Sequence, residues 1–215
     1  MSEKNTNKYA IVDLEATSAS STASIIQVGI VIMQNGQVID EFASDVNPHQ
    51  ELDEHIVHLT GITDQQLAQA PDFSEIARTI FELIESCIFV AHNVKFDANL
   101  LAEALFMEGF ELRTPRVDTV ELAQVFYPTF EQYKLSHLSK VLNLDLAQAH
   151  TAIEDARATG QLLFHLMDKI ASLPRQTIEM LLTFSDNLLF ETELVIREAI
   201  RGQNLGLSKE YVMLE

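Results

Sequence analysis

A short apolar run that ends in two carboxylates constrains this chain more than any other stretch. The run is Tyr9-Ala10-Ile11-Val12-Asp13-Leu14-Glu15. Side chains of a strand alternate between its two faces, so Asp13 and Glu15 point to the same side of one strand. Neighbouring carboxylates repel each other and raise each other's pKa unless a positive charge lies between them. The run therefore predicts either a strand whose polar end enters a loop or one half of a divalent-metal site.

The hydrophobic pattern predicts an α/β fold in which an antiparallel meander precedes alternating helices and strands. Strands are expected over 9–13, 25–33 and 38–42, with the turn Asn35-Gly36 between the last two, and further strands over 87–91 and 116–118. Helices are expected over 54–59, 63–68, 73–85, 94–107, 119–126, 137–142 and 151–170. This order is typical of a mixed five-stranded sheet flanked by helices.

The chain changes character after Pro174. Residues 176–200 have the apolar spacing of a helix, which Ser185-Asp186 is expected to break in two. These helices either extend the main core or form an arm that docks on something outside this sequence. The predicted organisation is a flexible N-terminus over 1–7, a main domain over 8–171 and a C-terminal helical arm or linker over 172–215.

Composition narrows the class of protein. Of the 215 residues, 47% are hydrophobic, which is enough for a full core. The single cysteine, Cys87, allows no internal disulfide and fits a reducing compartment. The sequence shows no signal core or membrane-spanning run, so we expect a cytoplasmic protein without a membrane partner. The formal net charge of −18 argues against a basic face that binds nucleic acid. If the substrate is a polyanion, bound metal ions would have to neutralise its phosphates at the reacting centre.

Two later stretches carry residues that could complete a metal site. Asp97 lies in the first turn of the helix that follows the strand over 87–91. Asp155 lies in the first turns of the helix over 151–170, and His150 comes just before that helix. Alone, Asp97 and His150 could each be polar residues at a helix start. Together, the carboxylates place hard oxygen ligands for Mg²⁺ or Mn²⁺ at strand ends and helix starts, where α/β folds bind ligands. Two such ions could clamp a phosphodiester displacement while a histidine deprotonates the attacking water.

These residues resemble, in the same order, the three motifs of the DEDDh (DnaQ-like) 3′→5′ exonucleases. The matching stretches are Asp13-Leu14-Glu15, Asn93-x-x-Phe96-Asp97 and His150-x-x-x-x-Asp155. The histidine five residues before the last aspartate marks the DEDDh branch. The segments Ile25-Ile26-Gln27-Val28-Gly29 and His58-Leu59-Thr60-Gly61-Ile62-Thr63 are also similar to that family. The resemblance covers residues 8–171 and implies an RNase H-like fold.

The resemblance also implies a role for each site residue. Asp13 would contact two divalent metal ions, Glu15 and Asp155 would complete the tighter site, and Asp97 would hold the second ion. His150 would be the general base, and Glu15 would also help to orient the water. Ala16 stands where many relatives have Thr, but no ligand is lost, so we expect an active enzyme. Four further residues would contact the substrate or position it: Thr17, Thr60, Asn93 and Phe96.

Within that family, Leu135-Ser136-His137-Leu138-Ser139-Lys140 and the segment after residue 171 resemble the N-terminal exonuclease domain of Gram-positive DinG-type helicases. That resemblance implies release of nucleoside 5′-monophosphates from single-stranded DNA 3′ ends in DNA repair, with a helicase part following. RNA ends remain an alternative substrate. Proofreading exonucleases of DNA polymerases share the motifs, and a non-catalytic scaffold with the same fold is the alternative from another class.

Overall fold

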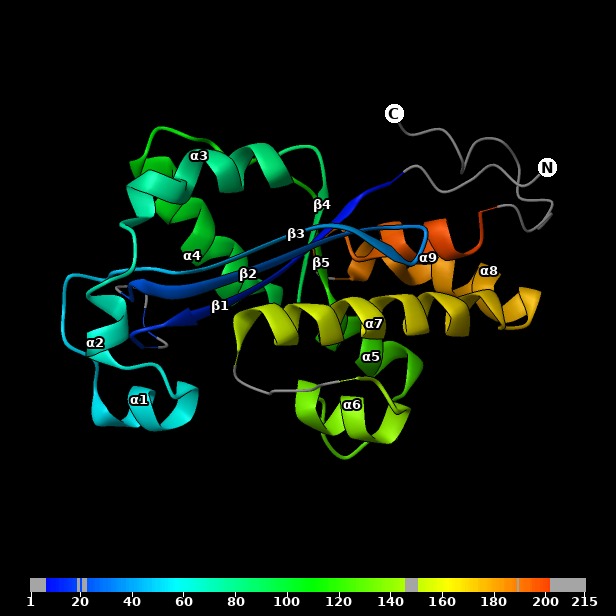
Figure 1. Ribbon diagram of the computed structural model, residues 1–215. Helices are drawn as coiled ribbons and strands as arrows, with labels where there is room; N and C mark the ends of the chain where they lie inside the picture. Colours follow the sequence, from blue (N-terminus) through cyan, green and yellow to red (C-terminus); the bar gives the residue numbers. More distant parts are fainter. Residues whose placement is uncertain (1–6, 19, 21–22, 146–150, 189, 202–215) are drawn as a thin grey trace.

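The computed structural model describes residues 7–18, 20, 23–145, 151–188 and 190–201. It confirms the mixed five-stranded sheet, whose strand order is β3-β2-β1-β4-β5 (Figure 1). In this sheet β1 pairs antiparallel with β2 and parallel with β4, while β4 pairs parallel with β5. The strands are β1 (Tyr9–Ala16), β2 (Ile25–Gln34), β3 (Gln37–Asp45), β4 (Ile88–Ala91) and β5 (Arg116–Asp118).

The helices follow the predicted order and cover both faces of the sheet. None of those in the described ranges combines the length and the apolar character that a membrane-spanning segment requires. They are α1 (Glu54–Thr60), α2 (Asp64–Leu67), α3 (Phe73–Ile84), α4 (Val94–Met107), α5 (Thr119–Phe126), α6 (Leu135–Leu142), α7 (Ala152–Ala171), α8 (Arg175–Phe184) and α9 (Glu193–Ala199), with the 3₁₀ turn η1 (Ser185–Asn187) between the last two.

The two faces of β1 belong to two different core layers. Tyr9 and Ile11 pack with residues of α5, α6 and α7, whereas Ala10, Val12 and Leu14 pack with residues of α3 and α4. Figure 1 shows α7 running along one side of the sheet and α3 and α4 on the other. Because strand side chains alternate, the odd-numbered carboxylates of β1 lie on the α7 side.

The strands of the meander are longer than the sequence predicts. β1 reaches Ala16 rather than ending near residue 13, because Asp13 and Glu15 pair with Gly29 and Gln27 of β2. The polar side chains suggested an end to the strand, but backbone pairing does not depend on them. The hairpin turn is confirmed, since Asn35 and Gly36 have φ angles of 53° and 75°.

The segment after Pro174 contributes to the main core. The predicted break is confirmed, with α8 ending at Phe184 and η1 beginning at Ser185. Four buried residues of this segment belong to the same hydrophobic layer as α7, namely Ile178, Val195, Ile196 and Ile200. Of the two expectations for this segment, extension of the main core is the one that its described residues fulfil.

Candidate metal centre

Three carboxylates from two distant parts of the chain converge at the end of β1. Asp13, Glu15 and Asp155 each offer an oxygen, and these atoms lie within 4.8 Å of one another. The first two come from one face of β1, as the alternation of the strand predicts, and Asp155 comes from the first turn of α7. Carboxylate oxygens this close together are typical ligands of Mg²⁺ or Mn²⁺.

A glycine of β2 allows α7 to begin so close to the sheet. Gly29 pairs with Asp13, and a Cβ atom built on it would lie 2.2 Å from the carbonyl carbon of Ala152. The neighbouring Gln27 fixes the same helix start, since its Oε1 accepts a hydrogen bond of 2.9 Å from the Ala152 N–H. The Gln27 amide in turn donates to Asp45 Oδ1 at 2.7 Å. Together, the glycine and the glutamine bring Asp155 to Asp13.

An ion pair holds the next turn of α7 against the sheet. The Nε of Arg157 donates to Glu41 Oε1 of β3 at 2.8 Å, and a second nitrogen of the guanidinium bonds the other oxygen of Glu41. Arg157 also pairs with Glu154 within α7. Its hydrogen bond holds the pKa of Glu41 below the usual range. The orientation of α7 is therefore fixed at its first turns, where Asp155 lies.

Asp97 approaches the same strand from the opposite layer. It lies in the first turn of α4, is 5% exposed, and its Oδ1 accepts a hydrogen bond of 3.0 Å from the Leu14 N–H. Leu14 separates Asp13 from Glu15, so this bond places the fourth carboxylate beside the other three. Burial, with contributions from Glu15 and Asp118, raises the pKa of Asp97 to about 8.

The electrostatics of the cluster favour a bound cation. The pKa of Asp13 lies well above its ordinary value, first because of burial and then because of Asp97, Asp155 and Glu15. Burial and Asp155 raise the pKa of Glu15 to about 7. Every cause acting on these two groups is upward, as expected for carboxylates that lack a compensating positive charge. The residues therefore fit a divalent metal ion, which would reverse each of these shifts.

Asp118, at the end of β5, holds the start of α4, and the sequence analysis did not single it out. Its carboxylate accepts hydrogen bonds from the N–H groups of Asn93 and Val94, each at 3.2 Å, and from Val120 at 2.8 Å. One side chain thus caps the helices α4 and α5. Asp118 directly precedes the helix predicted over 119–126, and an aspartate at that position is an N-cap signal. This signal could have predicted that Asp118 caps α5. Its bonds to α4 depend on tertiary structure.

The residues expected near the substrate have different environments. Asn93 and Phe96 line a pocket of about 340 Å³ together with Lys95 and Asn99. The Thr17 hydroxyl accepts a hydrogen bond from the Ser24 N–H at 3.0 Å. The Thr60 hydroxyl makes bonds within its own segment, donating to the Ile56 carbonyl at 2.9 Å and accepting from the Ile62 N–H at 3.1 Å. His150 lies outside the described residues.

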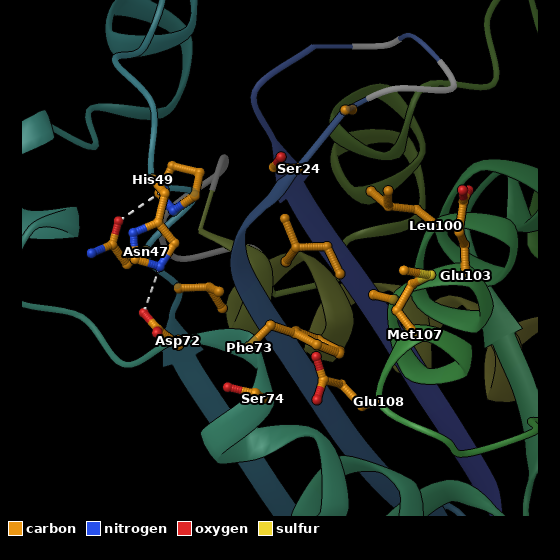
Figure 2. A pocket seen from close by; sticks show the side chains of 15 residues that line it. Ser24, Asn47, His49, Asp72, Phe73, Ser74, Leu100, Glu103, Met107 and Glu108 are labelled. Atoms are coloured by element: carbon orange, nitrogen blue, oxygen red, sulfur yellow. Dashed lines mark hydrogen bonds and ion pairs between the residues drawn. The ribbon is translucent and has the colours of Figure 1, made fainter.

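A second pocket of about 460 Å³ lies between the start of β2, α3 and α4 (Figure 2). Leu100 and Glu103 of α4 line both this pocket and the one beside Phe96. On its opposite side, His49 pairs with Asp72 at 2.8 Å. The side chains that Figure 2 draws around it combine apolar groups with carboxylates. Because the two pockets share lining residues, this pocket adjoins the one at Phe96.

Comparison with known proteins is consistent with this site. A family model described as "Exonuclease" (RNase_T) matches residues 10–163. The 3′-5′ exonuclease DinG of Staphylococcus aureus (strain USA300) is 36% identical over 210 residues, which cover 96% of this chain and 23% of that protein. The chain thus spans less than a quarter of the length of the curated relatives that it matches.

Two solved structures share the fold. Exonuclease X, in complex with 5′ overhanging duplex DNA, gives a TM-score of 0.62 at 21% identity, covering 74% of this chain and 91% of that one. The nuclease domain of 3′hExo, a DEDDh family member bound to rAMP, gives a TM-score of 0.65 at 17% identity and covers 75% and 92% respectively. Both similarities support the RNase H-like architecture of the sheet and its helices.

Proposed function

Because this chain belongs to the exonuclease family whose model matches residues 10–163, we propose that it removes nucleotides one at a time from the 3′ end of single-stranded DNA, with Mg²⁺ or Mn²⁺ as cofactor. The observation that carries the proposal is the convergence of Asp13, Glu15 and Asp155 within 4.8 Å. Asp97 joins them through the Leu14 N–H. Burial and then the neighbouring carboxylates raise the pKa values of Asp13, Glu15 and Asp97, and a bound divalent cation would counter both effects.

In this proposal the four carboxylates would hold two divalent ions. Asp13 would be a ligand shared by both sites, Glu15 and Asp155 would complete one site, and Asp97 would serve the second. When bound, such ions would supply positive charge at the terminal phosphate and the leaving oxygen. His150, directly before α7, accepts the proton of the attacking water, and Glu15 helps to orient that water. The products are a nucleoside 5′-monophosphate and a strand shortened by one nucleotide with a free 3′ hydroxyl.

The substrate is proposed to reach the site along α4. Asn93 and Phe96 line the pocket beside the start of that helix, where Phe96 offers a ring on which a base can stack. Thr17 and Thr60 are proposed to position the terminal nucleotide, although both hydroxyls also make structural hydrogen bonds. A chain with a net charge of −18 has little general attraction for phosphates, so we expect the metal ions to provide most of it.

We propose that residues 8–171 form the exonuclease domain and that residues 172–215 lead to a helicase part of a longer, cytoplasmic protein. The S. aureus relative supports the idea of a longer protein, since the region similar to this chain makes up 23% of its length. A helicase part would bind DNA and deliver single-stranded ends, which would compensate for the acidic charge of the exonuclease domain. DNA repair is the process that would use such a combination.

The test uses single-stranded oligonucleotides labelled at either end, incubated with the purified chain and Mg²⁺ or Mn²⁺. A 3′ label should appear in mononucleotides at once, whereas a 5′ label should give a ladder of progressively shorter strands. The same ladder from RNA would extend the substrate range. EDTA and Asp13→Ala should each abolish release. Absence of metal-dependent release from the unmodified chain would refute the proposal.

A further inference from the structure

Residues 191–192 of the C-terminal segment lie against the free edge of the sheet. β5 is an edge strand, and its Arg116 exchanges two hydrogen bonds with Glu191. The Arg116 N–H donates to Glu191 Oε2 at 2.8 Å, and the Glu191 N–H donates to the Arg116 carbonyl at 3.0 Å. The Asp118 N–H donates to the hydroxyl of Thr192 at 3.4 Å. Residues 191–192, which lie beyond the region matched by the family model, thereby satisfy groups that an edge strand would otherwise expose.

The strand that the arm contacts is also the strand that holds α4. The Asp118 carboxylate accepts the N–H groups of Asn93 and Val94. From the other end of β5, Arg116 Nη1 donates to Asn99 Oδ1 at 3.0 Å. Residues 191–192 are therefore connected to the first turns of α4 by two sets of hydrogen bonds through β5, one through Asp118 and one through Arg116.

The first turn of α4 carries a carboxylate of the metal centre. Asp97 lies between two contacts to β5, at Asn93 and Val94 on one side and at Asn99 on the other. Its carboxylate accepts a hydrogen bond from the Leu14 N–H of β1. A shift of α4 relative to β1 would lengthen that bond of 3.0 Å and move Asp97 away from Asp13 and Glu15. Catalysis is sensitive to such shifts, because displacements of about 1 Å lower rates by as much as about 100-fold.

The arm is itself well anchored at this point. Thr192 has no exposed surface, and Val195, Ile196 and Ile200 beyond it are buried in the layer that includes α7. The buried Glu198 accepts a hydrogen bond of 2.8 Å from the side chain of Asn7, which precedes β1. Residues 191–200 therefore pack as part of the domain rather than as a loose tail.

We propose that Glu191 and Thr192 are positioning residues of the metal centre, which hold Asp97 in place through β5 and Asp118. The inference rests on the proposed exonuclease function and adds to it an element outside the family motifs. A displacement of residues 191–192 would therefore be transmitted to Asp97 through β5, without any contact between these residues and the substrate.

The experiment compares the chain carrying Glu191→Ala and Thr192→Val with a matched control carrying Glu191→Gln and Thr192→Ser. The first pair removes both acceptors, and the control pair keeps an oxygen at each position. Glu191→Ala alone, at an exposed position, keeps the test decisive if the double variant fails to fold. All activities are measured at a temperature at which melting curves show each variant fully folded.

The first measurement is amide hydrogen exchange of the metal-free chain. In the Ala/Val variant we expect exchange at residues 93–99 to rise by about tenfold, with the β1–β2 pairing unchanged and the Gln/Ser control like the unmodified chain. The second measurement is nucleotide release, in which kcat should fall by about tenfold while KM stays within about twofold. A merely structural role would lower the melting temperature alone.

Several outcomes would overturn the inference. The first is that amide exchange at residues 93–99 is unchanged in the Ala/Val variant. The second is that exchange there is faster but kcat is unchanged. The third is that the Gln/Ser control differs from the unmodified chain in exchange or in kcat. If the unmodified chain releases no nucleotide, the proposed function fails. In that case the exchange data, together with Mn²⁺ affinity followed by electron paramagnetic resonance, still decide whether the arm positions Asp97.

Discussion

Gly29 of β2 lies directly against Ala152, the first residue of α7. A Cβ atom on Gly29 would come within 2.2 Å of the carbonyl carbon of Ala152 and 2.3 Å of the Ile153 nitrogen. Gly29 is also the partner of Asp13 in the register of β1 and β2. Because Gly29 has no side chain, α7 can approach β2 closely. This brings Asp155 of α7 near Asp13 of β1, the strand that pairs with β2.

Gly29→Ala should separate these elements. The added methyl group meets backbone atoms rather than a flexible side chain, so we expect the free energy of unfolding to fall by about 1–3 kcal/mol. The displacement of Asp155 should lower kcat by about 100-fold. Chemical denaturation and oligonucleotide degradation measure the two effects.

The matched control for this variant is Gly160→Ala, further along α7. Its Cβ would meet Met33 Sδ at 2.4 Å, and Met33 is a side chain that can rearrange. We expect this variant to lose stability but to retain kcat within about threefold. An equal loss of kcat in both variants would show that the close contact at Gly29 does not govern the metal centre.

Asp13→Asn should stabilise the metal-free chain while abolishing activity. The substitution removes the most crowded charge of the cluster, so the melting temperature in EDTA at pH 8 should rise by a few degrees. Nucleotide release should fall by at least about 1,000-fold, because a ligand shared by both ions is lost. Asp168→Asn, at an exposed carboxylate of α7, should change neither quantity. If Asp13→Asn lowers the melting temperature of the metal-free chain, Asp13 is not repelled by the neighbouring carboxylates as described.

The mixed five-stranded sheet and the clustering of three carboxylates could be predicted from the sequence because both depend on local patterns. Alternation in β1 places Asp13 and Glu15 on one face, and the helix starts predicted at residues 94 and 151 are close to the observed starts at Val94 and Ala152. The motif resemblance then adds the order of the carboxylates, which the convergence of Asp13, Glu15 and Asp155 supports.

The contacts that position these ligands could not be predicted in the same way. The bond from Gln27 to the Ala152 N–H joins residues 125 positions apart, and that from Asp118 to the Val94 N–H joins residues 24 apart. Nothing in the local periodicity of a chain specifies such pairs. The role of residues 191–192 at β5 depends likewise on tertiary packing, and helical spacing showed only that a helix was expected there.

The stability of the metal-free chain should depend on pH in a defined direction. The pKa of Glu15 rises from 4.5 to about 7 on folding, and that of Asp97 from 3.8 to about 8. Between these limits the folded state binds more protons than the unfolded state, so the free energy of unfolding should fall as pH increases from about 4.5 to about 8.

Thermal melting in EDTA across this range measures the effect. Saturating Mn²⁺ binds the deprotonated carboxylates, so it should stabilise the chain most at the upper end of the range. Glu15→Gln should reduce the slope between pH 4.5 and 7. A metal-free chain that becomes more stable over this range would contradict the charge distribution described above.

His150→Ala should separate proton transfer from metal binding. If His150 is the general base, kcat should fall by about 100- to 10,000-fold, whereas the Mn²⁺ affinity should stay within about threefold. The pH–rate profile should also lose its acidic limb. His137→Ala, a histidine of α6, provides the control. Loss of Mn²⁺ affinity equal to the loss of kcat would reassign His150 to the metal ligands.

The most direct measurement is anomalous X-ray diffraction from crystals soaked in Mn²⁺. We expect one peak bounded by Asp13, Glu15 and Asp155 and a second beside Asp97, with both peaks absent from crystals of Asp13→Asn. Mn²⁺ bound elsewhere, or no peak at these carboxylates at a concentration that supports nucleotide release, would contradict it.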